Sequence, residues 1–149
     1  MIEKLEIIEF DIIKNNNGSI IPLHKRNQLM KGFGEVYFST IHPNVVKAWH
    51  LHKKMTVLYS VIYGEILCVF CNKNESKKKQ LFVKKINTNS KKRIIIKVPP
   101  NIWVGFKCVG LKTAIIANIT NIPYAQDKPV RLETVSSNIN YNWSNEKKY

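Results

Sequence analysis

Cysteine is scarce in this chain, and its pattern excludes the common cysteine-based scaffolds. Only Cys68, Cys71 and Cys108 occur, and an odd number argues against a disulfide framework. Cys68 and Cys71 form a C-x-x-C inside EILCVFCN, a run typical of a strand. Strand positions three apart point to opposite faces, so these two thiols cannot bind one zinc ion together. We therefore expect no metal site here, and we expect the cysteines to be buried as small apolar side chains.

Long hydrophobic runs are also missing. No apolar segment approaches the roughly 20 residues that a membrane span needs. The N-terminal sequence MIEKLEIIEF mixes acidic with apolar residues, which is typical of neither a signal peptide nor a transit peptide. We expect a cytoplasmic protein with no membrane partner.

Acidic residues are few, since 10 Asp and Glu against 24 Lys and Arg leave a formal charge of +14. Such a charge can indicate nucleic-acid binding. Lysines cluster, however, in the turn-like tracts NKNESKKK (72–79), NTNSKKR (87–93) and NEKK (145–148), and no helix-turn-helix, RRM or zinc-finger pattern accompanies them. We favour solvated loops over a nucleic-acid groove. A positive field would still attract a nucleotide diphosphate.

Helical periodicity is absent as well. No apolar pattern keeps a 3.6-residue period over the roughly ten residues that a helix needs. Apolar residues instead alternate or form short β-branched blocks, which favours an all-β sandwich or barrel. The predicted strands span residues 5–13, 35–41, 45–52, 57–63, 65–70, 80–86, 93–98, 102–109 and 113–119.

The length of 149 residues suits one domain with one core. We expect a single domain, 1–149, with its core at about residues 35–120. Residues 121–149 are rich in turn formers and spaced aromatics, which predicts an irregular tail over the barrel with Tyr124, Tyr141 and Trp143 as anchors. Surface packing and ligand contact both remain open for these three side chains.

Two histidines form the most informative pair. On the predicted strand 45–52, His50 and His52 share one face because side chains repeat every two residues. Two imidazoles side by side are costly to bury without partners, which favours a solvent-accessible pocket inside the barrel. The lysines that bracket the pair are Lys47, Lys53 and Lys54.

The same segment resembles the first cupin motif by spacing, with His50, His52, Val57 and Gly64 at its four marked positions. The second cupin motif matches residues 99–104, and its histidine position is Val104. Two of four expected metal ligands are thus valines, which carry no lone pair. We expect no metal and no cofactor.

Four segments in order resemble the dTDP-4-dehydrorhamnose 3,5-epimerase family over about residues 35–143. KAWHLH (47–52) is similar to the family's R-G-L-H-x-Q, and VPPNIWVGF (98–106) is similar to I-P-x-G-x-x-H-G-F. ANITN (117–121) falls at Y-K-x-T-N, and INYNW (139–143) resembles I-x-Y-D-W. The resemblance implies a cupin-type double-stranded β-helix (jelly-roll) barrel, a homodimer and a nucleotide-linked 4-keto sugar as ligand.

The resemblance also implies catalytic roles. His50 matches the base that removes the proton at C3 or C5 of the sugar, and Lys47 matches an arginine that could hold a phosphate. The family's proton-returning tyrosine falls on Ala117, its enolate-stabilising lysine on Val57 and its second pocket histidine on Val104. No evident match exists for the aspartate that orients the base.

Tyr59, Tyr63 or Tyr124 could replace the missing acid. Tyr59 is preferred, provided that a bulge or turn near residues 53–55 lets positions 50, 52 and 59 all face inward. The candidate catalytic residues are therefore His50 and Tyr59. The candidate substrate-binding residues are Lys47, Trp49, His52, Lys54, Trp103, Tyr124 and Arg131.

Three functions stay open. The first is epimerisation of a dTDP-linked or other nucleotide-linked 4-keto-6-deoxy sugar in deoxysugar or surface polysaccharide biosynthesis. The second is a cupin 3,4-ketoisomerase, because those enzymes carry an H-x-H-K segment like residues 50–53. The third is a sugar-nucleotide-binding barrel that has lost turnover, which the missing tyrosine, lysine and aspartate favour.

Overall fold

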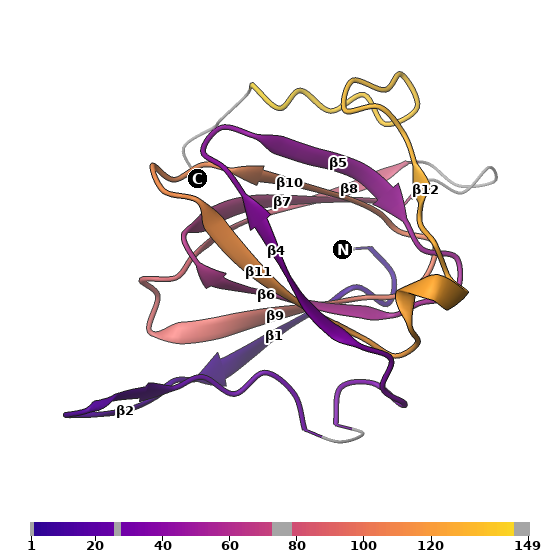
Figure 1. The fold of residues 1–149 in the computed structure, drawn as a ribbon. Helices are drawn as coiled ribbons and strands as arrows, with labels where there is room; N and C mark the ends of the chain where they lie inside the picture. Colours follow the sequence, from indigo (N-terminus) through magenta and orange to yellow (C-terminus); the bar gives the residue numbers. More distant parts are fainter. Residues whose placement is uncertain (1, 26–27, 73–78, 145–149) are drawn as a thin grey trace.

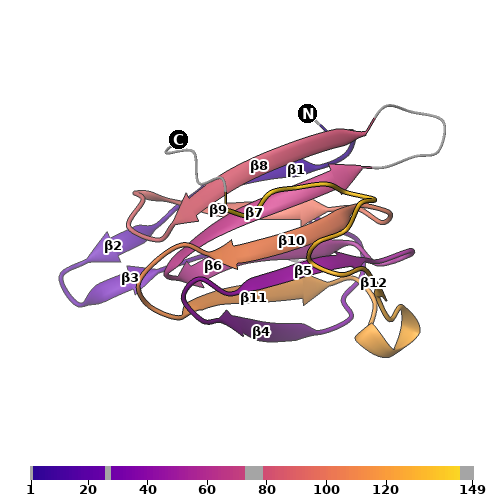
Figure 2. The ribbon, with the colours of Figure 1, turned by 90° about the horizontal axis from the view of Figure 1, so that it is seen from above.

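The computed structural model describes residues 2–25, 28–72 and 79–144. Two antiparallel five-stranded sheets face each other (Figures 1 and 2). The first sheet has the order β1 (Glu6–Asp11), β9 (Lys92–Val98), β6 (Val57–Tyr63), β11 (Ala114–Thr120), β4 (Val36–Ile41). The second sheet has the order β12 (Val130–Arg131), β5 (Val46–Leu51), β10 (Trp103–Cys108), β7 (Glu65–Asn72), β8 (Gln80–Asn87).

The path of the chain explains this order. From β4 to β7, and again from β8 to β12, each strand lies in the opposite sheet from the strand before it. This alternation winds the chain around one core as a double-stranded β-helix, so the predicted jelly-roll barrel is confirmed. All nine predicted strands are present, within a few residues of their predicted ends.

Three short strands were not predicted. β2 (Ile13–Asn15) and β3 (Gly18–Ile20) form a hairpin that projects from the body (Figure 1). In the segment expected to be irregular, β12 pairs with β5, and a single 3-10 turn, η1 (Tyr124–Gln126), precedes it. The described chain contains no helix long and apolar enough to cross a membrane.

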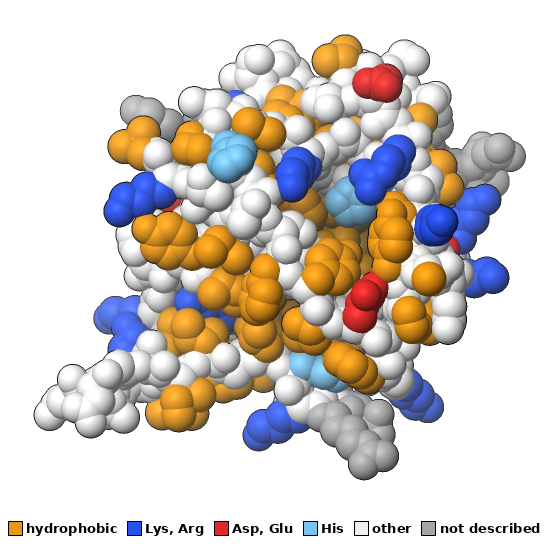
Figure 3. Space-filling model, in the orientation of Figure 1, with side chains coloured by type: hydrophobic (Ala, Val, Ile, Leu, Met, Phe, Trp, Pro, Cys, Tyr) orange, Lys and Arg blue, Asp and Glu red, His pale blue; other side chains and the backbone are white. Residues whose placement is uncertain are grey.

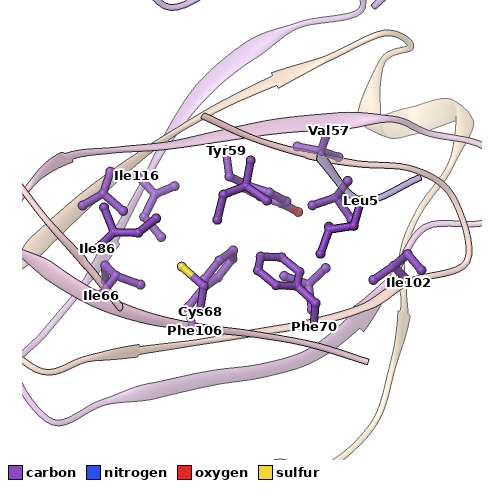
Figure 4. Packing of buried hydrophobic residues seen from close by; sticks show 14 of the residues in the cluster. Leu5, Val57, Tyr59, Ile66, Cys68, Phe70, Ile86, Ile102, Phe106 and Ile116 are labelled. Atoms are coloured by element: carbon purple, nitrogen blue, oxygen red, sulfur yellow. The ribbon is translucent and has the colours of Figure 1, made fainter. Parts of the chain in front are cut away.

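The core lies between the sheets. Figure 4 shows side chains from both sheets meeting there, among them Tyr59 and Ile116 from the first and Cys68, Phe70 and Phe106 from the second. Cys68 faces this core, whereas Cys71 packs in a second cluster on the outer face of the second sheet. All three cysteines are buried free thiols, as predicted.

The C-terminal segment covers the outer face of the second sheet (Figure 1). Ile139, Tyr141 and Trp143 pack around Trp49 from β5. The Trp49 ring centroid lies 5.2 Å from that of Trp143 and 6.3 Å from that of Tyr141. Tyr141 and Trp143 therefore anchor the tail by packing.

The described lysine-rich turn at residues 87–93 lies on the surface of the barrel. Lys91 is exposed before β9, and Lys92, the first residue of β9, is exposed and pairs with Glu9 at 3.3 Å. The tract 145–148 and most of the tract 72–79 lie outside the described residues.

Candidate functional site

A cavity of about 610 Å³ opens between β4 of the first sheet and β5 of the second. Figure 3 shows a hollow on this face, with a histidine and basic side chains on one side and an acidic side chain on the other. The charged residues that line the cavity are Lys47, Arg131 and Glu35. Two cations at the rim suit an anionic ligand.

A β-bulge in β5 gives the cavity its basic wall. Across β10, His50 lies opposite Val104 and Lys47 lies opposite Phe106, with the register shift between Val104 and Gly105. Val104 and Phe106 both face the core. The bulge thus brings Lys47 to the face that carries His50, although the two lie an odd number of residues apart and strict alternation would separate them.

His50 lies against aromatic neighbours. Its Nε2 is 3.2 Å from the Tyr59 hydroxyl, and its ring centroid is 6.0 Å from that of Phe106. Burial, with His52 and Arg131 nearby, lowers the pKa of His50 from 6.5 to about 3. At neutral pH His50 is therefore an uncharged imidazole that can accept a proton.

Tyr59 keeps its proton. Its side chain reaches the cavity from β6 and is almost fully buried. Burial raises the pKa of Tyr59 far above its ordinary value of 10.0, with a smaller contribution from Tyr37. The phenol can therefore donate a hydrogen bond or a proton, but it is not a base.

His52 is held by Asp127, which precedes β12. Its Nδ1 lies 2.8 Å from the Asp127 carbonyl oxygen and 3.6 Å from Oδ2 of the same residue. The ring centroids of His50 and His52 are 6.3 Å apart, and both rings line the cavity. The prediction that the two imidazoles share one face is confirmed.

The opposite wall is built by β4 and β11. Tyr37 and Ser39 line the cavity from β4, and Asn118 lines it from β11. The Asn118 side-chain amide donates to the Ser39 hydroxyl at 2.9 Å and to the Tyr37 carbonyl at 3.2 Å. Burial raises the pKa of Tyr37, helped by Glu35 and Tyr124 and opposed by Arg131.

Residues 124–131 cross from one sheet to the other and close one end of the cavity. The Tyr124 amide donates to Glu35 Oε1 at 2.6 Å. Arg131 pairs with His50 in the β12–β5 ladder, and it lines the cavity together with Tyr124 and Pro129. The predicted tail therefore supplies part of the site wall.

Known proteins share this architecture. None of the known protein-family models matches the chain. A dTDP sugar isomerase from Desulfovibrio desulfuricans G20 is 28% identical with a TM-score of 0.89, over 97% of this chain and 94% of that chain. The RmlC epimerase of Legionella pneumophila Philadelphia 1, solved in complex with dTDP-4-keto-L-rhamnose, is 18% identical with a TM-score of 0.80, over 95% and 79%. The chain therefore shares the cupin fold of these enzymes.

Two further proteins are similar to the chain. The sugar 3,4-ketoisomerase QdtA of Thermoanaerobacterium thermosaccharolyticum, solved with TDP, is 16% identical with a TM-score of 0.70, over 89% of this chain and 90% of that chain. The spore coat polysaccharide biosynthesis protein SpsL of Bacillus subtilis (strain 168) is 24% identical over 120 residues, which are 79% of this chain and 80% of SpsL.

Most, but not all, of the residues proposed for the site line the cavity. His50, His52, Tyr59, Lys47, Tyr124 and Arg131 line it. Trp49 and Trp103 do not, because both pack in the cluster on the outer face of the second sheet. Lys54 is exposed in the turn after β5, and it is not among the residues that line the cavity.

Val57, Val104 and Ala117 stand where the 3,5-epimerase family is expected to have a lysine, a histidine and a tyrosine, and they do not all face the same way. Val57 and Val104 face the core between the sheets. Ala117 pairs with Phe38 and Ser60, whereas its neighbour Asn118 pairs with the cavity residues Tyr37 and Tyr59. Ala117 therefore faces away from the cavity. The chain bends at residues 53–54, between β5 and β6, so the turn expected near residues 53–55 is present. The register shift at Val104–Gly105 is a separate irregularity that was not predicted.

Four site residues were missed: Glu35, Tyr37, Asn118 and Asp127. Alternation in EVYFSTI (35–41) places Tyr37 on the face of Ser39 and Ile41, so this signal was available. Asp127 gives no local signal, because its partners lie 72 to 75 residues away in the sequence. Across the described chain, no group of three or more His, Cys, Asp or Glu side chains is placed to hold a metal ion.

Proposed function

We propose that this RmlC-like cupin epimerises a nucleotide-linked 4-keto-6-deoxy sugar by removing the proton next to the keto group, with His50 as the base. The observation that carries the proposal is the uncharged His50 imidazole in a cavity whose rim bears Lys47 and Arg131. The dTDP sugar isomerase that is 28% identical over nearly the whole chain supports the substrate class.

The charges of the cavity suit the reaction. A diphosphate bound by Lys47 and Arg131 would place negative charge near His50 and raise its low pKa toward the range where a base works best. The same cations would offset the charge of the enolate that forms when the proton leaves. The reaction as proposed uses no metal and no cofactor.

The acid can lie on either side of the sugar. Tyr59 contacts His50 Nε2 at 3.2 Å, so it would return a proton on the side from which His50 removed one. Inversion of a carbon needs a donor on the other side. Tyr37, on the opposite wall and with a raised pKa, fits that role.

A 3,4-ketoisomerase is the second candidate. Moving a keto group between adjacent carbons requires proton transfers on one side of the ring. His50, Tyr59 and His52 form a continuous set on one side of the cavity, which favours this reaction. Similarity in fold to QdtA is in keeping with it.

One experiment separates these functions. The protein is incubated with dTDP-4-keto-6-deoxyglucose in deuterated water, and the sugar is followed by NMR. Deuterium at C3 or C5 with the keto group still at C4 supports epimerisation, and a keto group at C3 supports ketoisomerisation. Tight dTDP-sugar binding with neither change would overturn both and leave a binding protein.

Binding by the rim cations is tested separately. Arg131→Gln and Lys47→Gln should each weaken dTDP binding by about tenfold in calorimetry, because each removes a charge-assisted contact. Lys54→Gln, which changes an exposed lysine near the site, is the matched control and should bind as wild type does. Equal affinities in all four proteins would contradict this binding mode.

The proposal also covers the cellular compartment, the type of pathway and the oligomeric state. Three buried free thiols suit the reducing cytoplasm, where we place the reaction. Similarity to SpsL suits a step in surface polysaccharide synthesis.

We also propose a homodimer, because the outer surface near β4 and the β2–β3 hairpin exposes the apolar side chains of Ile13, Ile20, Phe33, Val36 and Phe38.

A further inference from the structure

The cavity wall opposite His50 carries a buried amide whose orientation is fixed by its neighbours. Asn118 on β11 is 3% exposed, and its Nδ2 lies 3.2 Å from the Tyr37 carbonyl oxygen and 3.1 Å from the Ile116 carbonyl oxygen. A carbonyl oxygen can only accept, so the amide nitrogen must lie toward these two groups. Asn118 lines the cavity, and no donor among the described residues reaches its Oδ1. This oxygen is therefore an acceptor available to a ligand.

The same amide determines the direction of the Ser39 hydroxyl group. Ser39 lines the cavity from β4, and its Oγ accepts a hydrogen bond from Asn118 Nδ2 at 2.9 Å. A serine hydroxyl group also has one proton to donate, and none of the side chains or carbonyl groups in the described chain accepts it. The hydroxyl group thus accepts on the side of Asn118 and can donate to a ligand in the cavity.

Ser39 and Asn118 together present a donor next to an acceptor. A complementary ligand carries an acceptor next to a donor, with both groups on adjacent atoms of a rigid frame. In a 4-keto-6-deoxy sugar, the 4-keto oxygen is an acceptor and the neighbouring 3-hydroxyl group is a donor. The pair therefore matches the hydroxyketone edge of such a sugar.

We propose that Ser39 donates a hydrogen bond to the 4-keto oxygen of the sugar, while Asn118 Oδ1 accepts one from the 3-hydroxyl group. The inference rests on the proposed function for its substrate. When His50 takes a proton from the carbon next to the keto group, the electron pair of the broken C–H bond forms an enolate on the keto oxygen. The pair returns to carbon when a proton is added back. The Ser39 hydrogen bond strengthens as the enolate charge forms, and it transfers no proton.

This role separates recognition of the sugar from recognition of the nucleotide. In the proposed binding mode, Lys47 and Arg131 hold the diphosphate, whereas Ser39 and Asn118 contact only the sugar. Affinity for dTDP alone should therefore not depend on Ser39 or Asn118. A loss confined to the sugar is the result that a merely structural role of the pair would not produce.

Calorimetry with two ligands tests the Asn118 contact. The ligands are dTDP-4-keto-6-deoxyglucose and dTDP-4-keto-3,6-dideoxyglucose, which lacks the 3-hydroxyl group, and every protein carries His50→Gln so that the sugar is not converted. With Asn118 in place, loss of the hydroxyl group should weaken binding about tenfold, because a buried acceptor is left unpaired. With Asn118→Leu, both sugars should bind equally and dTDP should bind as before. Equal affinities for the two sugars with Asn118 in place would overturn the inference.

The rate of deuterium uptake tests the Ser39 contact. Ser39→Ala should slow uptake by dTDP-4-keto-6-deoxyglucose on the order of 100-fold, as expected for loss of a donor to the enolate oxygen. Ser39→Thr keeps the hydroxyl group and should stay close to wild type. Thr40→Ala is the matched control, because it removes an exposed hydroxyl group from the next position of the same strand. A wild-type rate in Ser39→Ala, or an equal loss of affinity for dTDP alone, would contradict the assigned contact.

Ser39→Ala also covers failure of Asn118→Leu to fold, because it removes one oxygen atom from a half-buried position. The two arms distinguish this inference from the proposed function. No deuterium uptake in wild type, with the tenfold preference for the 3-hydroxyl group retained, would overturn the proposed function and leave the recognition of the sugar in place.

Discussion

At the scale of single residues, the site depends on buried groups whose protonation is set by their surroundings. His50 is kept neutral because burial and the nearby His52 and Arg131 disfavour its charged form. Tyr59, beside it, is kept protonated. A neutral acceptor and a protonated donor 3.2 Å apart are the minimum set for moving a proton.

His50 should make the fold sensitive to acid. Its pKa is about 3 in the folded protein against 6.5 in the unfolded chain, so the unfolded state binds more protons between these values. The stability linked to His50 is complete above pH 6.5 and falls as the pH drops toward 3, by about 5 kcal/mol in total.

Urea unfolding of wild type and His50→Gln from pH 7 to pH 3.5 measures this contribution. The free energy of unfolding of the variant should decline less steeply with falling pH. His42→Gln, which changes an exposed histidine, is the matched control and should follow wild type. Parallel curves for all three proteins would contradict the assigned burial of His50.

At the scale of elements, the β5 bulge determines which side chains reach the site. At the bulge, β10, β5 and the C-terminal segment approach one another closely. A Cβ at Gly105 would lie 2.8 Å from the Ala48 Cβ and 2.7 Å from Trp143 Cζ2. Gly105 thus lets β10, the bulged β5 and the C-terminal segment pack together.

Gly105→Ala should lower the free energy of unfolding by about 1 to 3 kcal/mol, because the added methyl group forces these neighbours apart. Chemical denaturation checks the size of the effect. A double-mutant cycle with Trp143→Leu should show coupling between the two changes. Additive effects would mean that the Trp143 contact is not the cause.

The strands could be predicted from the sequence, because alternation and β-branched blocks are local signals. The inward direction of His50, His52 and Tyr59 followed from the same reasoning. The same alternation places Trp49 on the face opposite His50, so its position outside the cavity could have been predicted. The packing that buries Trp49 could not, since the aromatic side chains that cover it lie about 90 residues later. Asp127 was missed for the same reason, since only the folded chain brings it to His52.

At the scale of the whole molecule, the barrel is covered unevenly. The C-terminal segment covers the second sheet, and N-terminal residues pack on part of the first, where Leu58, Ile95 and Ile119 form a third cluster with Met30. β4 remains an edge strand, and Phe38 on its outer face is 62% exposed. An exposed apolar edge of this kind favours pairing with another chain.

Phe38→Lys should therefore convert the proposed dimer to a monomer without altering the cavity, because Phe38 faces away from it. Light scattering coupled to gel filtration gives the mass of each protein. Leu81→Lys, which changes an exposed leucine on β8, an edge strand of the other sheet, should remain dimeric. A monomeric wild type, or a dimeric Phe38→Lys, would contradict the assignment of this surface.

The central claim is that His50 removes a proton from a bound nucleotide sugar. The most direct measurement is the initial rate of deuterium uptake by dTDP-4-keto-6-deoxyglucose with wild type, His50→Gln and His42→Gln. We predict that His50→Gln lowers the rate by at least about 100-fold, as expected for loss of a general base, while His42→Gln keeps the wild-type rate. An equal rate in His50→Gln, with the fold intact, would contradict the account.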